Sequence, residues 1–299
     1  MKISLGPIYF YWHREAVFDF YAKIEKTDVD IVYLGEVVCS KRRQLKLDDW
    51  LIIAKRLSDA GKEVVLSTLT LLEADSELKH LSRICQTSDY LIEANDFAAI
   101  NLMIKQDKPF VVGHSVNLYN AASINMLASK GMSRWCFPVE LSQDTLKQII
   151  QQKHQDLQVE VFGFGKMPMA FSARCFTARA YDLDKDDCQY KCLDHEEGLL
   201  LSTKEDQSFL IMNGIQTMSA DTFNLINQVQ SMQEMGVDVV RISPQPFDTE
   251  KVIKVFKDKI DNNISDEQAL TTLTPLISHG QCDGYWFEKE GMSRIELSQ

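Results

Sequence analysis

The feature that most constrains the fold is a regular alternation of short apolar or β-branched runs with segments of helical periodicity. Eight such runs occur, at Lys2–Leu5, Ile31–Gly35, Glu63–Thr68, Tyr90–Glu93, Phe110–Gly113, Trp135–Val139, Val159–Gly163 and Val237–Ile242. Alternation of this kind predicts a parallel sheet, and eight units fit a closed (β/α)8, TIM-barrel-like fold better than an open doubly wound sheet. We therefore predict a single α/β barrel domain over residues 1–299.

The segments between the runs carry helix signals. Leu47–Gly61 places apolar residues on one face and ends in a glycine suited to a C-terminal cap, and Asn120–Gly131 has the same organisation. A further helix is predicted over Asp221–Met235, with Ser219 as its N-terminal cap and Gly236 at its end.

The alternation is interrupted once, after the seventh predicted strand. Residues 164–220 form an insertion that is far longer than an ordinary barrel loop and contains three of the seven cysteines. Its aromatic and aliphatic content argues against a flexible linker, and the stretch LLLSTKEDQSFLIMNG reads as a small hairpin. Residues 262–299 are predicted to form a C-terminal extension.

Charge and hydropathy exclude several classes of partner. With 32 basic and 43 acidic residues the net charge is −11, and no basic patch is segregated, so nucleic acid is not an expected partner. No run reaches the roughly 18 apolar residues that a membrane span requires. The N-terminal MKISLGPIYFYWHREAVF reads better as a first strand than as a signal peptide, so we expect a cytoplasmic protein in which structural disulfides are disfavoured.

Four cysteines form the main chemical signal. Cys175, Cys188 and Cys192 follow the pattern C-x12-C-x3-C inside the insertion, and Cys39 lies just beyond the second predicted strand. In a barrel the loops after strands two and seven emerge at the same C-terminal face. All four thiols can therefore converge on one site.

The spacing alone leaves the occupant of that site open. Four cysteines suit a tetrahedral zinc ion or an iron–sulfur cluster. Zinc modules usually carry C-x2-C pairs, which are missing here, so a cluster that bridges two loops fits somewhat better than zinc, and a chain without metal also remains open. A C-x3-C redox pair fits less well, because such pairs normally have two intervening residues. Cys85, Cys136 and Cys282 are expected to have packing roles.

The segment VEVFGFGKMPMAFSARCFTARAYDLDKDDCQYKC, together with Cys39, resembles the peptidase U32 family, including its members in oxygen-independent ubiquinone biosynthesis. Glu160, Phe162 and Gly165 match the family's E-x-F-x-x-G segment. The resemblance implies a TIM-barrel-like protein that binds a [4Fe–4S] cluster. The ligands that it implies are Cys39, Cys175, Cys188 and Cys192.

The resemblance also implies partners and a reaction. It implies a heterodimer with a second U32-family protein that carries its own cluster, and hydroxylation of the aromatic ring of ubiquinone precursors without O2. The substrate would be a prenylated aromatic ring, brought by a lipid-carrier protein or held in an apolar groove. No catalytic residue is assigned, and whether this chain is itself the enzyme stays open. The alternatives are a U32-type peptidase, with or without zinc, and a non-catalytic partner with a structural metal site.

A cluster in such a site is expected to transfer electrons or support structure, because four thiolates occupy all four iron corners. The surrounding loop carries seven acids against Lys185 and Lys191 between Asp182 and Glu197. Negative charge disfavours adding an electron, which predicts a low reduction potential. The alternative is that these acids form only a solvated face.

Other polar residues lie at predicted strand ends and are weaker candidates. His114 suits an acid/base role, although a hydrogen-bonded structural histidine is more common. Arg174 suits a contact with a cluster sulfur, an anionic substrate or the acidic loop. Ser115 and Ser172 lack the G-x-S-x-G context of a nucleophile, and neither HExxH nor a phosphate-binding glycine loop is present. The remaining candidates are Glu36, Glu93, Asn95, Asn117, Glu140 and Lys166.

Overall fold

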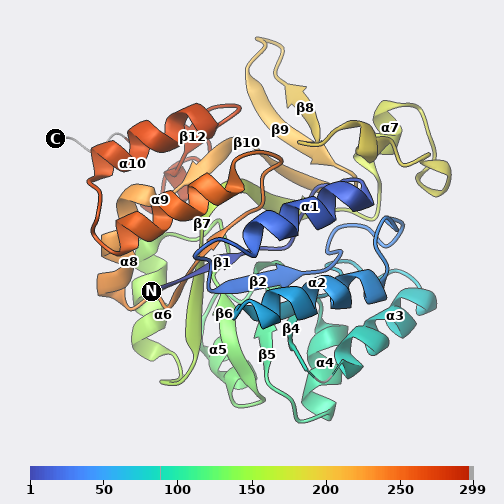
Figure 1. The fold of residues 1–299 in the computed structure, drawn as a ribbon, viewed down its shortest axis with the longest axis horizontal. Coiled ribbons are helices and arrows are strands. Elements are labelled where there is room, and N and C mark those ends of the chain that lie inside the picture. The colour runs from blue at the N-terminus through green and yellow to red at the C-terminus, as the bar shows by residue number, and fades with distance from the viewer. Residues whose placement is uncertain (88, 296–299) are drawn as a thin grey trace.

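In the computed structural model, which describes residues 1–87 and 89–295, eight parallel strands close into a barrel (Figure 1). The barrel strands are β1 (Lys2–Leu5), β2 (Ile31–Leu34), β3 (Glu63–Ser67), β4 (Leu91–Ala94), β5 (Phe110–Val112), β6 (Met132–Cys136), β7 (Gln158–Phe171) and β11 (Val239–Ile242). Each of the strands β1 to β6 pairs in parallel with the strand that follows it. The strand β11 pairs in parallel with both β7 and β1, which closes the barrel. The predicted (β/α)8 barrel is confirmed.

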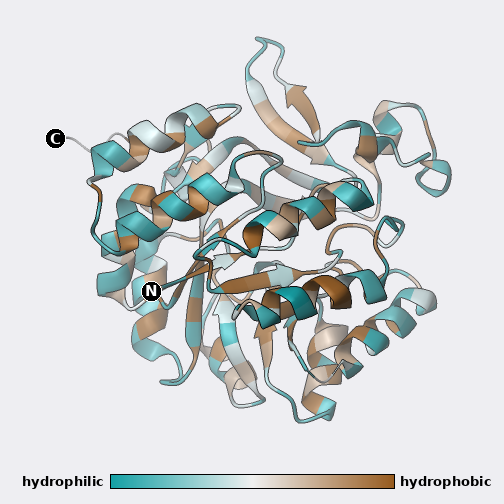
Figure 2. Cartoon of the chain, viewed as in Figure 1, coloured by the Kyte–Doolittle hydropathy of each residue, from teal (hydrophilic) through white to brown (hydrophobic). Residues whose placement is uncertain are grey.

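Helices cover the outside of the barrel and turn an apolar stripe towards it (Figure 2). They are α1 (Arg14–Ile24), α2 (Leu47–Asp59), α3 (Asp75–Gln86), α4 (Phe97–Lys105), α5 (Ala121–Ala128), α6 (Gln143–Gln152), α8 (Val229–Met235) and α9 (Thr249–Ile260). A short 3-10 turn, η1 (His114–Val116), follows β5. Because α2 and α5 lie where the apolar periodicity predicts them, these two helices are confirmed.

Six of the eight barrel strands begin and end within two residues of the prediction. The sixth begins at Met132, three residues early, because the inward-facing Arg134 interrupts the apolar run that marks a strand in the sequence. The seventh continues to Phe171, well beyond the barrel rim. This extension is the base on which the insertion is built.

The insertion adds an antiparallel sheet to β7. Its strands are β8 (Leu199–Ser202), β9 (Ser208–Asn213) and β10 (Gln216–Asn224). The extension of β7 pairs with β10, β10 with β9, and β9 with β8, so the predicted hairpin is confirmed (Figure 1). Between β7 and β8 lie α7 (Phe176–Ala180) and two 3-10 turns, η2 (Lys185–Asp187) and η3 (Lys191–Asp194).

The helix predicted over Asp221–Met235 is wrong in its first half. The chain is a strand up to Asn224, then a 3-10 turn, η4 (Ile226–Gln228), and only then the helix α8. The Ser219 hydroxyl caps no helix; it accepts a hydrogen bond from the Met167 N–H at 2.9 Å. Long-range pairing with β7 supplies the backbone partners of this stretch, and local periodicity does not report such pairing. Gly236, at φ +87°, ends α8 as predicted.

The C-terminal segment packs on the barrel. Its elements are α10 (Asp266–Leu273), η5 (Thr274–Leu276), β12 (Gln281–Cys282) and η6 (Gly284–Phe287). The helix α10 packs against α9, and β12 pairs with β10. Residues 296–299 of the predicted extension lie outside the described residues. In the part of the chain that the structure describes, no helix is long and apolar enough to cross a membrane.

Candidate functional site

The loop after β2 presents Cys39 at the C-terminal rim of the barrel. Gly35 starts the loop at φ +141°, where a Cβ atom would lie 2.5 Å from the Ser67 carbonyl oxygen, so this close approach requires glycine. The Glu36 carboxylate then accepts the backbone N–H groups of Val38 at 2.8 Å and of Cys39 at 3.0 Å. These bonds fix the turn on which the half-buried Cys39 lies.

Arg42, three residues later, fastens this loop to the insertion. Its guanidinium donates to the Tyr9 carbonyl oxygen and to Asn213 Oδ1, each at 2.6 Å, and lies 3.8 Å from the Glu36 carboxylate. The side chain is almost fully buried. Gly214 leaves room for it, because a Cβ atom there would lie 3.1 Å from the guanidinium. The loop after β2 and strand β9 are thus held together by one cation.

The insertion supplies the other three cysteines on a compact loop. Cys175 precedes α7, and its sulfur accepts the Ala178 N–H at 3.4 Å. Cys188 ends the turn η2 and Cys192 lies within η3, and between them Tyr190 has a positive φ of 53° that reverses the chain. All three side chains are partly exposed.

Two lysines tie the cysteine loop to neighbouring loops. Lys41 Nζ donates to the Lys185 carbonyl oxygen at 2.7 Å and forms an ion pair with Asp186. Lys185 Nζ donates to the Ala173 carbonyl oxygen at 2.7 Å and pairs with Glu73. The loop after β2, the loop after β3 and the insertion are therefore linked at the rim.

Electrostatic interactions connect the four cysteines, three of them directly and the fourth through a lysine. Cys175 interacts with both Cys39 and Cys192. Lys41 interacts with both Cys39 and Cys188, which connects the fourth cysteine. The structure thus brings the loops of all four residues to one part of the rim.

Burial and charge act in opposite directions at two of these sulfurs. Burial raises the pKa of the Cys39 and Cys192 thiols, which favours the neutral thiol, while the charge of Arg42 opposes that rise at both. A thiolate is the form that binds metal, so metal binding at these sulfurs would release their protons. Within residues 1–87 and 89–295, no group of three or more Cys, His, Asp or Glu side chains is arranged so that it could hold a metal ion.

The three cysteines outside this group are buried as expected: Cys85 and Cys282 are fully enclosed, and Cys136 is 3% exposed. Cys136 also accepts a hydrogen bond from Arg241 Nη2 at 3.1 Å, so it belongs to a polar cluster inside the barrel. Packing therefore accounts for two of them, and the third takes part in the network described next.

The barrel interior holds a second set of titratable side chains, only part of which the sequence singled out. Arg241 pairs with Glu160 at 2.6 Å and with Glu93 at 2.8 Å, and its guanidinium lies 4.1 Å from the Tyr33 ring centroid. Arg134 donates to the Tyr33 hydroxyl at 3.1 Å. Burial acts to raise the pKa of Glu160, but the two arginines outweigh it, so this pKa is lowered. Sequence reasoning missed the arginines, although a charge inside a buried strand is a usable signal.

His114 lies above this network at the barrel mouth. It lines a cavity of about 240 Å³ with residues from the loops after β3, β5 and β6 and from β7, including Asn117 and Glu140. Its Nε2 atom is buried without a hydrogen-bond partner in the described structure. Burial, reinforced by the charge of Arg241, lowers the pKa of His114 to about 3. A neutral imidazole at this position accepts or donates one hydrogen bond rather than carrying charge.

The remaining candidates lie elsewhere. Arg174 is exposed and takes part in no ion pair among the described residues, so the predicted link to the acidic loop is not formed. Lys166 is buried on β7, where its ammonium donates to the Ala220 carbonyl oxygen and burial lowers its pKa to about 8. Asn95 donates to the Thr68 carbonyl oxygen at 2.9 Å. Lys166 and Asn95 are bonded to residues outside the cysteine loops, and Arg174 directly precedes Cys175.

Comparison with known proteins gives one family match. The family model described as peptidase family U32 matches residues 19–296. A truncated 3-deoxy-D-arabino-heptulosonate 7-phosphate synthase from Thermotoga maritima is similar in structure, with 11% identity, a TM-score of 0.47 and coverage of 91% of this chain and 88% of that one. A tryptophan synthase complex from Pyrococcus furiosus has 10% identity, a TM-score of 0.44 and coverage of 91% and 98%.

Proposed function

Because the chain belongs to peptidase family U32, we propose that it is the [4Fe–4S] subunit of a heteromeric system that hydroxylates the aromatic ring of ubiquinone precursors without O2. This reading follows the resemblance to the UbiV type of the family. The observation that supports it is the gathering of Cys39, Cys175, Cys188 and Cys192 on linked loops at one part of the barrel rim. None of the seven cysteines is consumed by a disulfide.

The residues around these sulfurs suit an iron–sulfur cluster. Clusters are held by cysteine thiolates and tuned by hydrogen bonds to sulfur. The Ala178 N–H already donates to Cys175, and the Arg42 guanidinium stabilises negative charge on Cys192. When bound by four cysteines, such a cluster supplies one-electron transfer.

The proposal includes a partner and a substrate class. The partner is a UbiU-like U32 protein in a heterodimer, and the substrate is a prenylated aromatic ubiquinone precursor, delivered by a lipid-carrier protein. A cytoplasmic location belongs to the same proposal. The exposed rim, where most of the insertion's charged residues face solvent, is the surface available to such a partner.

Anaerobic metal analysis tests the cofactor. Protein purified without oxygen should be brown and contain iron and acid-labile sulfide at about four per chain. Alanine at any of Cys39, Cys175, Cys188 and Cys192 should remove most of both. Cys85→Ala and Cys282→Ala are matched controls, because both sulfurs are buried away from the rim and should leave iron unchanged. Equimolar zinc in place of iron would refute the cluster.

A second measurement tests the reaction. Cells that depend on this chain for quinone synthesis under anaerobic conditions should lose that synthesis when a cluster cysteine is replaced, while the heterodimer still assembles. A U32-type peptidase remains the alternative that the family description allows. Hydrolysis of a peptide library by the purified chain, undiminished by the four cysteine replacements, would favour that alternative.

A further inference from the structure

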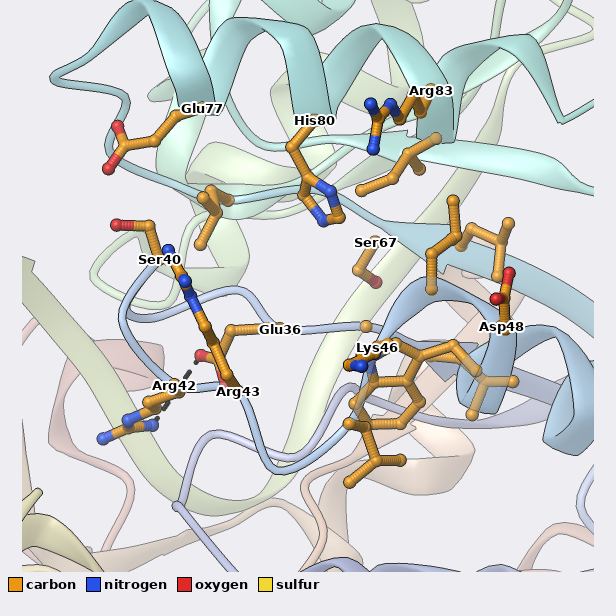
Figure 3. Close-up of a pocket in the computed structure, with 18 of the residues that line it drawn as sticks. Glu36, Ser40, Arg42, Arg43, Lys46, Asp48, Ser67, Glu77, His80 and Arg83 are labelled. Carbon is orange, nitrogen blue, oxygen red and sulfur yellow. Dashed lines mark ion pairs between the residues drawn. The ribbon is translucent and has the colours of Figure 1, made fainter.

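A large pocket lies between helices α2 and α3, beside the loop that carries Cys39. Its volume is about 840 Å³, within the range of roughly 300–1,000 Å³ that small-molecule sites occupy. Figure 3 shows side chains from α3, among them His80 and Arg83, directed towards residues of the loop after β2 and the start of α2. Neither the sequence patterns nor the family match assigns a role to this pocket.

The walls and floor of the pocket are mostly apolar. Leu34 and Leu66, at the ends of β2 and β3, form the buried floor. Trp50 from α2, Leu45 from the loop before it and Ile84 from α3 line the sides and are each only partly covered by the protein. A pocket lined in this way stabilises an apolar chain or ring, because the occupant removes that surface from water.

The rim of the pocket carries four basic side chains that lie outside the ion pairs of the described residues. Arg43, Lys46, Lys79 and Arg83 line it, and none of them takes part in an ion pair among residues 1–87 and 89–295. Burial lowers the pKa of His80, and the charges of Arg83 and Arg43 lower it further, so both guanidiniums act electrostatically on this ring.

The acids of the same rim do not neutralise those cations. Glu77 is engaged at the start of α3, where its carboxylate accepts the backbone N–H groups of Glu73 at 2.6 Å and of Ala74 at 3.1 Å. Glu36 is held by Arg42 and by its own loop. Asp48 is the remaining acid, against four cations without an ion-pair partner. An anion is therefore the favoured occupant of the rim.

We propose that this pocket binds a small amphiphile, with its apolar chain against Trp50 and the leucines and its anionic head against Arg43 and Arg83. The head is a carboxylate or phenolate, which suits the planar donor groups of arginine. A prenylated aromatic acid and a fatty acid share this chemistry. Where the occupant is the aromatic one, the inference rests on the proposed function and names the site of its substrate.

The pocket lies next to the loop that carries Cys39. Ser40 and Lys41, which directly follow Cys39, form part of the pocket wall. The same Lys41 contacts Cys39 and Cys188 electrostatically. A ligand in the pocket would therefore lie against the same loop that carries Cys39.

Calorimetric titration of the full chain tests the inference with four probes. The probes are 3-geranyl-4-hydroxybenzoate, 4-hydroxybenzoate without the chain, geraniol without the acid, and oleate. We expect the geranyl acid to bind at least about tenfold more tightly than either fragment, since both the chain and the head contribute. Its affinity should fall as salt is raised, because the rim charges are exposed. Equal affinity for the geranyl acid and geraniol would overturn the role of the rim.

Two variants and a matched control locate the binding. The double variant Arg43→Gln/Arg83→Gln should weaken binding of the geranyl acid by about tenfold, since two solvent-exposed charge contacts are lost. Lys55→Gln, on α2 but paired with Asp59 outside the pocket, should leave binding unchanged. Trp50→Phe should abolish the tryptophan fluorescence change that accompanies binding. Unchanged affinity in the double variant, with folding verified by circular dichroism, would refute the site.

The probes also separate this inference from the proposed function. Tighter binding of the geranyl acid than of oleate supports both. Equal or tighter binding of oleate supports the pocket as an amphiphile site and removes its link to the aromatic substrate. Iron and sulfide analysis reports on the cluster independently of any of these titrations. Binding of neither amphiphile overturns the inference and leaves the cluster assignment untouched.

Discussion

The barrel interior and the cysteine rim both gather titratable side chains, but they satisfy them in opposite ways. Inside the barrel, Arg241 is paired with Glu93 and Glu160, and all three are at most 2% exposed. At the rim the four cysteines are partly exposed, and the strongest partners of their loops are Arg42 and two lysines. The interior carboxylates are paired with arginines of the same chain, whereas the rim sulfurs lie on exposed loops near the charges of Arg42 and Lys41.

This difference separates structure from function. Removing one partner of a buried ion pair leaves an uncompensated buried charge and strongly destabilises the protein, which makes the interior network a structural element. Under the proposed function, the rim thiols instead hold a cluster that the chain receives from outside. We therefore expect interior replacements to affect folding and rim replacements to affect cofactor content.

The largest effect is expected for Arg241→Met. Removing this cation leaves the buried Glu93 without a cationic partner and Glu160 with only Arg134, at 3.9 Å, among the described residues. The free energy of unfolding should fall by about 3 to 5 kcal/mol, the usual result of breaking a buried ion pair on one side. Urea denaturation followed by circular dichroism measures it.

A matched arginine tests whether burial is the cause. Arg174→Met removes an exposed arginine that has no ion pair in the described structure, and should change stability by less than about 0.5 kcal/mol. The double variant Arg241→Met/Glu93→Gln should recover part of the loss, because one unpaired carboxylate is removed. Equal stability of Arg241→Met and the parent would show that the interior network is not structural.

Arg42→Met is expected to have the next largest effect on stability, and it should also lower the iron content. It leaves the buried Tyr9 carbonyl oxygen and the Asn213 amide each short of a hydrogen bond, so stability should fall by about 2 to 3 kcal/mol. It also releases the loop of Cys39 from β9, so iron content after anaerobic reconstitution should fall as well. Arg56→Met, which removes only an exposed pair with Glu25, should keep the iron. Full iron content in a destabilised Arg42→Met variant would show that the cysteine site does not depend on the hydrogen bonds of Arg42.

The pH dependence of stability reports on His114. Its folded-state pKa of about 3 lies below the unfolded value of about 6.5, so the unfolded chain takes up a proton that the folded chain does not. The stabilisation is complete above pH 6.5 and is lost by up to about 1.4 kcal/mol per unit as pH falls towards 3. Urea midpoints between pH 7 and 5 should fall less steeply for His114→Gln than for the parent.

His154 is the control for that slope. It is exposed and lies on the loop after α6, so His154→Gln should retain the parent's pH dependence. An identical slope in all three proteins would mean that the His114 ring is accessible to protons in the folded state.

The fold was largely predictable because each barrel unit marks itself locally. Short apolar strands, capped helices and the single long insertion are visible in the sequence, and barrel topology then places the loop of Cys39 and the insertion at one rim. The failed helix over Asp221–Met235 shows the limit, since its first half is a strand whose partner, β7, lies some fifty residues earlier. Pairing over such distances decides between two states that local periodicity cannot separate.

The cysteines of the site could be predicted from the sequence, but the residue that positions their loops could not. Cysteine spacing identifies Cys175, Cys188 and Cys192 as a set, whereas Arg42 is recognised only through Tyr9 and Asn213, which are 33 and 171 residues away in the chain. The interior arginines had a signal that was not used. In VVRIS and MSRWC a single charge interrupts a run that is otherwise buried, and such a charge must be paired inside the protein.

The smallest effect on stability, and the sharpest test of the comparison, is expected for Lys41→Gln. Its ion pair with Asp186 is largely solvent-exposed on the aspartate side, so its loss should cost less than about 0.5 kcal/mol. Lys41 nevertheless contacts Cys39 and Cys188, and its charge favours electron uptake there, against the acidic loop that predicts a low potential. The reduction potential of the reconstituted variant should therefore be lower than that of the parent in an anaerobic redox titration, while the urea midpoint stays the same. Lys55→Gln, which breaks a comparable exposed pair on α2, should change neither quantity. A lower urea midpoint with an unchanged potential would reverse the assignment, because it would make this lysine part of the structural framework and remove its role in the potential.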